Sequence, residues 1–342
     1  MTPHPLISPG ALYGGFYLPM PKTTHAPPHQ NRANVRLGPS AHPGGINHGA
    51  PSPKRPDDRP YPAWSIGIYC GDNLQGLRPH PGARNPVVTR HHVTDIPAAF
   101  VADPFMARDG DGWVMFMEVM NVDTGRGEIA LARSADGVAW TYEGVVLREP
   151  FHLSYPYVFN SEGKHYLLPE TLGAGAVRLY LGDPFPTRWR YLRELILGAY
   201  ADPSAFEYNG RWWLLCCGNP SGHDMLNLFS APALEAEWRE HASRPLIAGN
   251  RRGARPAGRV ITLDGNLVRF GQDCHPQYGT AVRGFGLTDL TTTSYAEREI
   301  GPILGPGKEE WNRRGMHHID PQRLEDRTWL ACVDGCAALT AP

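Results

Sequence analysis

Three Asp-Pro pairs open three apolar stretches of this 342-residue chain. They are Asp103 in "VADPFM", Asp202 in "YADPSAF" and Asp320 in "HHIDPQR", and alternating apolar and polar residues follow, as in a half-buried strand. Two carboxylates about 5 to 9.5 Å apart in one pocket can cleave a glycosidic bond, one as acid and one as base or nucleophile. Asp-Pro is also a simple turn signal at the start of a strand. Its recurrence in phase with a repeat favours a shared site.

The repeat is a unit built around a hairpin. Successive units begin at Asp103, Tyr155, Asp202, about Gly258 and Asp320, which are 47 to 62 residues apart. The turns "RDGDG", "NSEG" and "YNG" are hairpin signals, because Gly and Asn supply the positive φ that such turns demand. The fourth unit, "AGRVITLDGNLVRFGQD", keeps the hairpin and loses the Asp-Pro. The interval suits one four-stranded propeller blade.

The last unit has an inner hairpin only. Residues 64 to 93 contain "WSIGIYCGDNLQGLRP" and "NPVVTRHHV", which belong to no other unit and can supply the missing outer strands. We therefore predict an all-β protein in which residues 63–342 form a five-bladed β-propeller closed by its N-terminal strands. No segment longer than about ten residues shows helical periodicity, which argues against an α/β fold.

Residues 1–62 have a different composition. They hold 14 of the chain's 34 prolines, with Gly, His and Ser between them. Such a segment cannot bury enough apolar surface to offset the entropy of ordering, so we predict that it is disordered. A false start codon upstream of the true one would explain it equally well.

Composition limits the partners and the compartment. The formal net charge is −1, which gives no reason to expect nucleic acid or an anionic membrane as a partner. No run approaches the roughly 20 apolar residues of a membrane span, and the N-terminus lacks a secretory signal, so we expect a cytoplasmic protein. The six cysteines contain no Cys-x-x-Cys pair and are predicted to be free thiols. No cofactor is expected.

The first strands of propeller blades line the central channel, so their opening residues converge. Asp103, Asp202 and Asp320 should therefore stand around one channel mouth, with Tyr155 in the equivalent place on the second blade. Crowded like charges raise the pKa of one carboxyl, which keeps an acid protonated near neutral pH.

Two glutamates, Glu118 and Glu170, end second strands of the repeat. Two placements are open for each glutamate: its side chain faces the cavity, or it lies at a solvated strand end.

The fourth unit ends its second strand with "RFGQDC", which contains Arg269, Gln272 and Asp273. Arg and Gln at a cavity rim suit the hydroxyl or carboxylate groups of a sugar, or a phosphate. A surface ion pair explains Arg269 and Asp273 as well. Four aromatic residues are either platforms for sugar rings or fillers of blade interfaces: Tyr155, Tyr157, Trp212 and Trp213.

The motif "MHHIDP" adds His317 and His318, of which strand alternation lets one face the channel. His318 should share a face with Asp320. Such a pair forms a hydrogen-bonded strut, an acid/base or sugar-binding pair, or a metal site. No second His stands at ligand spacing, so we expect no metal.

Residues 64 to 336 resemble the five-bladed propeller superfamily that contains family 43 and family 32 glycosidases. More specifically, "VADPFM", "YLLPE", "ADPSAFEYNGRWWL", "GQDCHPQYG" and "HHIDPQRL" resemble the N-terminal propeller domain of glucosamine inositolphosphorylceramide transferases. In those transferases the transfer reaction is expected of a separate C-terminal domain, which these motifs do not cover. The resemblance therefore supports the fold far better than it supports catalysis.

Family 43 glycosidases carry the base Asp on the first blade, a pKa-tuning Asp on the third and the acid Glu at the opening of the fourth. Asp103 and Asp202 match the first two of these positions. The fourth unit opens with "RPAGRV", which has no carboxylate, so an acid would have to be Glu170, Asp320 or Asp273.

Two functions remain open. The first is a carbohydrate-active, glycoside hydrolase-like enzyme with Asp103 as base or nucleophile, Asp202 as its electrostatic partner, and Glu170 or Asp320 as the acid. The second is a non-catalytic module that binds a glycan or glycoconjugate and serves a separate glycosyltransferase. A carboxylate pair flanking an open pocket favours hydrolysis, whereas carboxylates paired with Arg or Lys favour binding.

Removal of the proline-rich segment tests the domain boundary. A chain that begins near Pro62 should keep its melting temperature within a few degrees, because residues 1–62 contribute no apolar core. A large drop in the melting temperature, measured by circular dichroism, would contradict this boundary.

Overall fold

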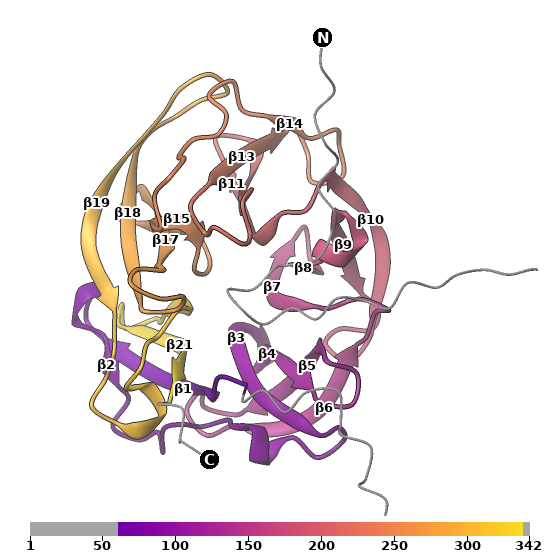
Figure 1. The fold of residues 1–342 in the computed structure, drawn as a ribbon, viewed down its shortest axis with the longest axis vertical. Coiled ribbons are helices and arrows are strands. Elements are labelled where there is room, and N and C mark those ends of the chain that lie inside the picture. The colour runs from indigo at the N-terminus through magenta and orange to yellow at the C-terminus, as the bar shows by residue number, and fades with distance from the viewer. Residues whose placement is uncertain (1–60, 338–342) are drawn as a thin grey trace, which may run out of the picture. The chain divides into compact units, whose positions relative to one another are not determined.

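The computed structural model describes residues 61–337, which form a five-bladed β-propeller. Five antiparallel sheets stand around one axis (Figure 1). The fold class predicted from the sequence is confirmed. The predicted disorder of residues 1–62 falls, except for the last two of them, outside the described residues.

Four blades follow one another along the chain, each written here from the axis outward. Blade 1 contains β3 (Ala98–Asp109), β4 (Gly112–Asn121), β5 (Arg126–Ser134) and β6 (Thr141–Leu147). Blade 2 contains β7 (Ser154–Ser161), β8 (Lys164–Glu170), β9 (Ala176–Gly182) and β10 (Trp189–Leu197). Blade 3 contains β11 (Ala201–Tyr208), β12 (Arg211–Cys217), β13 (Leu226–Ala231) and β14 (Arg239–Glu240). Blade 4 contains β15 (Arg252–Pro256), β17 (Asn266–Asp273), β18 (Ala281–Leu290) and β19 (Tyr295–Leu304), with β16 (Ile261–Leu263) paired to β17.

Blade 5 combines the first and the last strands of the described chain. Its inner strands are β20 (Ile319–Arg323) and β21 (Trp329–Cys336), and its outer strands are β1 (Trp64–Gly71) and β2 (Arg78–Pro79). β1 pairs with β21 over its whole length, and Figure 1 shows the indigo strand beside the yellow one. The predicted closure by N-terminal strands is therefore confirmed, and it pairs an edge that would otherwise be open.

Helices play a small part in the described chain. They are short 3₁₀ turns: η1 (Leu74–Gly76), η2 (Arg90–His92), η3 (Leu172–Ala174) and η4 (Glu310–Asn312). None of these turns has the length or apolar character of a membrane span.

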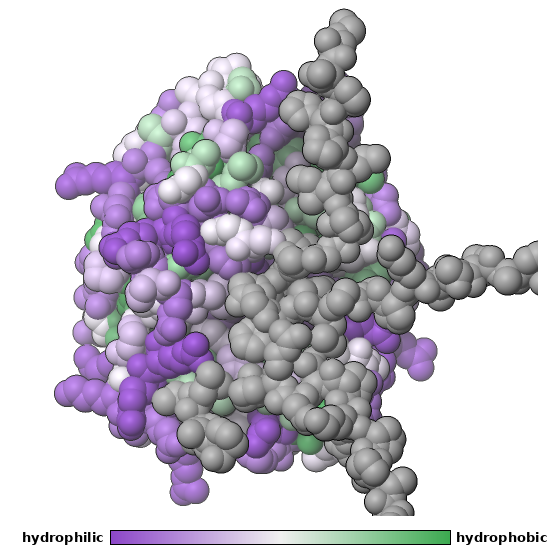
Figure 2. Space-filling model, viewed as in Figure 1, coloured by the Kyte–Doolittle hydropathy of each residue, from purple (hydrophilic) through white to green (hydrophobic). Residues whose placement is uncertain are grey.

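Apolar side chains from neighbouring blades pack face to face. The largest cluster joins blades 1, 2 and 3 and includes Phe116 of β4, Leu167 of β8 and Leu214 of β12. Burial on both faces explains why the middle strands are nearly continuous apolar runs rather than alternating ones. The outside is mostly hydrophilic in the view of Figure 2. All six cysteines are free, as predicted.

Left-handed backbone opens the inner strands of three blades. Asp103, Tyr155 and Asp202 have φ of 53°, 47° and 51°, and the pairing register shifts at each of these positions. Asp320 differs, because it pairs with Cys332 in an unbroken register and has no positive φ. The third Asp-Pro therefore does not reproduce the geometry of the first two.

Deletion of residues 64–93 tests the closure of the ring. The deletion removes both outer strands of blade 5 and exposes the edge of β21, so we expect cooperative loss of the fold. Far-ultraviolet circular dichroism and gel filtration would measure it. A stable, soluble core after the deletion would show that the ring does not depend on these strands.

Candidate functional site

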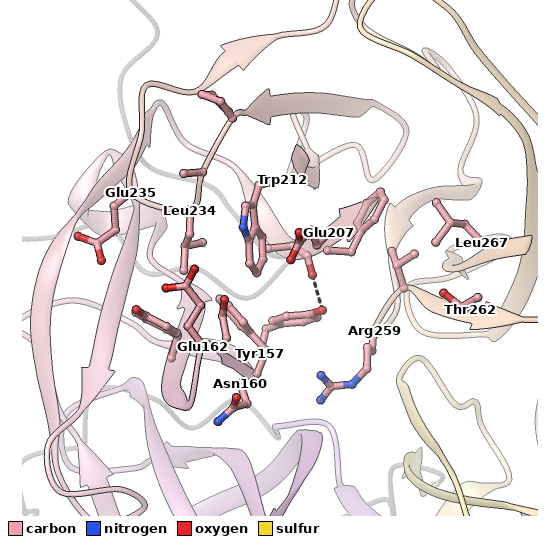
Figure 3. Close-up of a pocket in the computed structure, with 18 residues that line it drawn as sticks. Tyr157, Asn160, Glu162, Glu207, Trp212, Leu234, Glu235, Arg259, Thr262 and Leu267 are labelled. Carbon is pink, nitrogen blue, oxygen red and sulfur yellow. Dashed lines mark hydrogen bonds between the residues drawn. The ribbon is translucent and has the colours of Figure 1, made fainter. Parts of the chain in front are cut away.

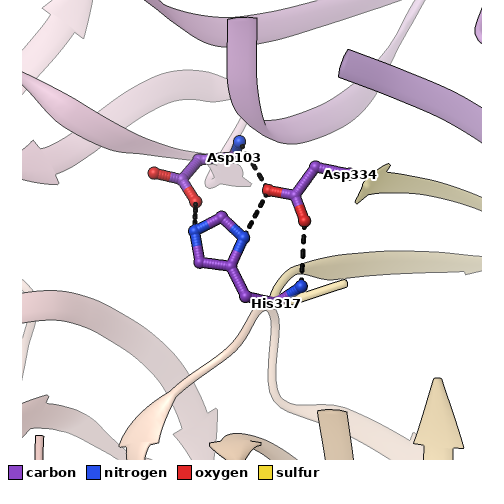
Figure 4. A group of neighbouring side chains, drawn as sticks. All are labelled: Asp103, His317 and Asp334. Carbon is purple, nitrogen blue, oxygen red and sulfur yellow. Dashed lines mark hydrogen bonds and ion pairs between the residues drawn. The ribbon is translucent and has the colours of Figure 1, made fainter. Parts of the chain in front are cut away.

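The carboxylate of Asp103 lies at the opening of β3 and interacts with two other blades. Its Oδ2 accepts a hydrogen bond of 3.2 Å from the N–H of Tyr155, and its Oδ1 lies 3.5 Å from Nε2 of His317. His317 stands between Asp103 and Asp334, with Nδ1 2.7 Å from the Asp334 carboxylate (Figure 4). Asp334 also accepts the N–H of Asp103 at 3.2 Å.

The pKa values of His317, Asp334 and Asp103 depend on one another. Burial alone would lower the pKa of His317, but Asp334 and Asp103 outweigh it and raise that pKa. Burial would raise the pKa of Asp334, but His317 outweighs it and lowers that pKa. Burial raises the pKa of Asp103 to about 7, against the pull of His317. The result is a buried imidazolium–carboxylate pair beside a carboxyl that titrates near neutral pH.

A guanidinium holds the second Asp-Pro carboxylate. Arg255 of β15 donates from Nε to Oδ2 of Asp202 at 2.6 Å and from Nη2 to Oδ1 at 3.1 Å, and Nη2 also lies 3.3 Å from Glu170. Gln272 donates to the same Asp202 Oδ2 at 2.7 Å. Arg255 is 1% exposed, so these are desolvated, charge-assisted hydrogen bonds.

Glu118 and Glu170 both turn inward from the ends of second strands. Oε1 of Glu118 lies 3.3 Å from Nε2 of His152, whose Nδ1 accepts the N–H of Gly127. Oε2 of Glu170 accepts the N–H of Asp202 at 3.2 Å. Burial raises the pKa of Glu170 to about 8, and burial together with nearby Asp103 raises the pKa of Glu118 well above its ordinary value.

These side chains form one electrostatic group, which we call the carboxylate cluster and define as Asp103, Glu118, Glu170, Asp202 and Asp334. Aromatic rings border it. Trp64 stacks on His317 with ring centroids 4.1 Å apart, and half-buried Tyr278 lies 5.1 Å from the same imidazole. The Tyr278 ring is also 5.4 Å from the Arg255 guanidinium.

Donor atoms of Asp103, His317 and Asp334 lie within 4.8 Å of one another, as they would around a metal ion. Asp334 and Asp103 raise the pKa of His317, so a protonated imidazole can hold the two carboxylates as an ion pair, whereas a neutral imidazole could coordinate an ion. The geometry is compatible with either arrangement.

Asp320 lies deeper, away from the mouth at which it was expected. Its carboxylate accepts from Nε of Arg259 at 2.7 Å and from the N–H of Met106 at 2.7 Å. The physical reason is the regular backbone at Asp320, since the left-handed turn that directs Asp103 and Asp202 is missing there.

Three other predicted site residues serve as struts. The hydroxyl of Tyr155 bonds to Ser204 and to the backbone of Gly258, and that of Tyr157 donates to the carbonyl of Ala205. His318 lies 3.1 Å from the carbonyl of Pro104, and burial lowers its pKa to about 3. The strut is the alternative that the contacts of His318 support.

The residues of the "RFGQDC" motif have two kinds of partner, because some contact the carboxylate cluster and others contact side chains of blade 4. Gln272 reaches the cluster through Asp202, as described above. Arg269 instead forms a bidentate pair with Glu297 and donates to the carbonyl of Gly253. Asp273 pairs with Arg283 at 2.8 Å. Arg269 and Asp273 thus form ion pairs within their own blade, Asp273 with the neighbouring strand β18 and Arg269 with β19, the next strand out.

Sequence reasoning did not assign Arg255, Asp334 or Tyr278 to the site. One signal was available for Asp334. Glu118 and Glu170 each pair with the residue just before Asp103 or Tyr155. Asp334 holds a similar place in blade 5, because it follows Val333, which pairs with the residue just before Asp320. Arg255 had no local signal, since its partner Asp202 is 53 residues away.

Comparison with known proteins shows the family of this chain. The family model of glucosamine inositolphosphorylceramide transferase 1, N-terminal, matches residues 56–336. The chain belongs to this family. It is 35% identical over 300 residues to glucosamine inositolphosphorylceramide transferase 1 of Oryza sativa subsp. japonica and 32% identical over 296 residues to that of Arabidopsis thaliana.

Those matches cover 80% of this chain but only 40% and 39% of the rice and Arabidopsis proteins. The chain thus spans about two fifths of the length of the curated relatives it matches.

Solved structures share the fold at low identity. A glycosyl hydrolase from Bacteroides ovatus has a TM-score of 0.59 at 11% identity, covering 76% of this chain and 92% of that one. The catalytic domain of a family 62 α-L-arabinofuranosidase from Coprinopsis cinerea has a TM-score of 0.52 at 13% identity, covering 80% and 97%. The family member therefore has a glycoside hydrolase-like propeller fold.

The raised pKa values predict how stability depends on pH. Asp103 and Glu170 hold protons in the folded state between their unfolded pKa values of 3.8 and 4.5 and their folded values of about 7 and about 8. Stability therefore falls as pH rises through that window, by about 1.4 kcal/mol per pH unit for each proton released only on unfolding. The raised pKa of His317 acts in the same direction above pH 6.5. His152, His223 and His318 act in the opposite direction below about pH 6.5, because burial lowers their pKa values to about 4, about 3 and about 3. We therefore expect a lower melting temperature at pH 8 than at pH 7, because above pH 7 these histidines are mostly neutral in both states.

Glu170→Gln separates the contribution of one group. The amide is neutral and keeps an acceptor for the N–H of Asp202, so the variant should lose less stability between pH 5.5 and 8 than the parent. Glu325→Gln, at an exposed position, is the matched control. Equal pH slopes for Glu170→Gln and the parent would show that Glu170 is ionised throughout this range.

Proposed function

We propose that this propeller recognises the sugar part of a glycoconjugate at its carboxylate cluster and acts by binding it rather than by cleaving it. The observation that carries the proposal is Arg255, which donates to both oxygens of Asp202 and contacts Glu170. A guanidinium on the inner strand of blade 4 stands where the acid Glu of family 43 glycosidases is expected. It occupies both oxygens of the Asp202 carboxylate, which hydrolysis would need as the tuning group.

The same cluster suits recognition of hydroxyl groups. Carboxylates and the amide of Gln272 accept and orient hydroxyl donors, and a hydrogen bond to a charged group contributes about 1.5 to 3 kcal/mol. Half-buried Tyr278 borders the cluster with an aromatic ring, and a sugar ring can stack on such a face. Polar acceptors beside an aromatic wall are the composition expected of a small-ligand site.

Similarity supports a role beside glycosyl transfer. The curated relatives are transferases by name, and this chain matches about two fifths of each. We therefore infer that the propeller presents or selects a glycan or glycolipid for a glycosyltransferase, which would be its partner.

Glycoside hydrolysis is the second candidate, because one observation favours it. Asp103 forms no ion pair with an arginine in the described chain, and its pKa of about 7 lets it exchange a proton near neutral pH. Glu170, with a pKa of about 8, would then supply the acid.

Asp103→Asn distinguishes the two functions, because it removes a charge and keeps the shape. With binding alone, the parent should turn over no glycoside, and the variant should bind glycans about 5- to 150-fold more weakly, which corresponds to about 1 to 3 kcal/mol. Calorimetry and a panel of glycosides and nucleotide sugars would measure both properties. Asp111→Asn, in the exposed turn at the other end of the same hairpin, is the control.

Turnover by the parent that falls more than about 100-fold in Asp103→Asn would establish hydrolysis instead. Unchanged affinity without any turnover would show that Asp103 only holds the N–H of Tyr155.

A further inference from the structure

A cavity lies at the opposite end of the propeller from the carboxylate cluster. Its volume is about 650 Å³, and its lining comes from the hairpin ends of blades 2, 3 and 4 together with the loop between β13 and β14. Asp202 and Glu207 lie on β11 at its two ends, and five residues of strand span roughly 17 Å at ~3.4 Å each. The cavity is therefore a separate place from the site described above.

Aromatic rings form one wall of this cavity. Phe159 stacks on Tyr166 with ring centroids 5.5 Å apart and lies 5.4 Å from the ring of Trp212. Trp212 is half-buried, so part of its indole remains accessible. A flat, partly exposed indole over a cavity of this size is suited to stacking with the apolar face of a sugar ring.

Three glutamate carboxylates lie beside the aromatic wall. Glu162, Glu207 and Glu235 line the cavity, and none of them forms an ion pair with any side chain in the described part of the chain. In Figure 3, Trp212 lies at the centre of the group, with Glu207 on one side and Glu162 and Glu235 on the other. Arg259 also lines the cavity, but its charge is matched by Asp320 at 2.7 Å.

We propose that this cavity is a second carbohydrate-binding site, specific for a neutral or amino sugar. The indole of Trp212 stacks on the ring, and the three carboxylates accept hydrogen bonds from hydroxyl or ammonium groups. The same carboxylates repel uronic acids and sugar phosphates, because Arg259, the one cation among the described residues that line the cavity, is already paired with Asp320. The volume accommodates one or two sugar units, within the range of ordinary ligand pockets.

The experiment counts sites and assigns each to one end of the channel. Full-length protein is titrated with glucose, glucosamine, their β-linked disaccharides and glucuronate, using calorimetry and saturation-transfer NMR. We expect Trp212→Leu to weaken binding of glucosamine and glucose at least tenfold, with no change in the melting temperature beyond a few degrees. Tyr191→Leu is the matched control, because Tyr191 is 45% exposed on the outer strand of blade 2 and does not line the cavity.

Glu207→Gln gives a second test that does not depend on the large indole. The neutral amide should reduce the preference for glucosamine over glucose several-fold, and Glu237→Gln, two residues beyond Glu235 and outside the cavity, should leave it unchanged. Both variants keep the side-chain shape, so loss of folding cannot explain the result.

The outcomes separate this site from the carboxylate cluster. Binding that survives Asp103→Asn and is lost in Trp212→Leu supports the second site whatever happens at the first. Binding that is lost only in Asp103→Asn places the sugar at the carboxylate cluster alone and overturns the proposal. Absence of saturable binding in the parent, or equal affinity for glucuronate and glucosamine, also overturns it.

Discussion

Backbone N–H groups at the openings of the inner strands must be paired, and carboxylates of the preceding blade pair them. Asp334, Asp103 and Glu170 accept the N–H groups of Asp103, Tyr155 and Asp202, so blades 5, 1, 2 and 3 are tied in order around the axis. The left-handed conformation costs a non-glycine residue about 1 to 2 kcal/mol, and a buried unpaired N–H costs about 1 to 3 kcal/mol. The side chains that fill the centre are therefore required by the backbone as well as by any ligand.

The need of the backbone for these carboxylates explains the unusual charge balance of the carboxylate cluster. Five buried carboxylates are opposed by the guanidinium of Arg255 and the imidazolium of His317. Complete ionisation would leave uncompensated charge in a low-dielectric interior, so Asp103, Glu118 and Glu170 have raised pKa values instead. A protonated carboxyl can still accept a backbone N–H, and it also gains a donor. The cluster thus satisfies the fold while remaining able to exchange protons.

Local signals were enough to predict the blades, whereas contacts between blades were not predictable. Turn residues and alternation specify each hairpin, and the unpaired inner hairpin at the C-terminus required strands from the N-terminus. Asp103 and Asp202 interact electrostatically, as their shared phase implied. Asp320 shares their motif but not their φ, because the register shift that turns them inward has no signature in the Asp-Pro pair itself. The reach of Arg255 to Asp202 depends on side-chain direction across a blade interface, which no local pattern encodes.

Closure of blade 5 brings the ends of the described chain together. The N–H of Ala337 donates to the carbonyl of Ala63 at 3.0 Å, one residue from Trp64, whose ring stacks on His317. A polypeptide joined at either end would thus be tethered beside the carboxylate cluster. Tethering at short range raises the effective concentration of one module at another to the millimolar scale. On the binding function proposed above, a module attached at either end would meet the bound ligand at that concentration without any interface between module and propeller.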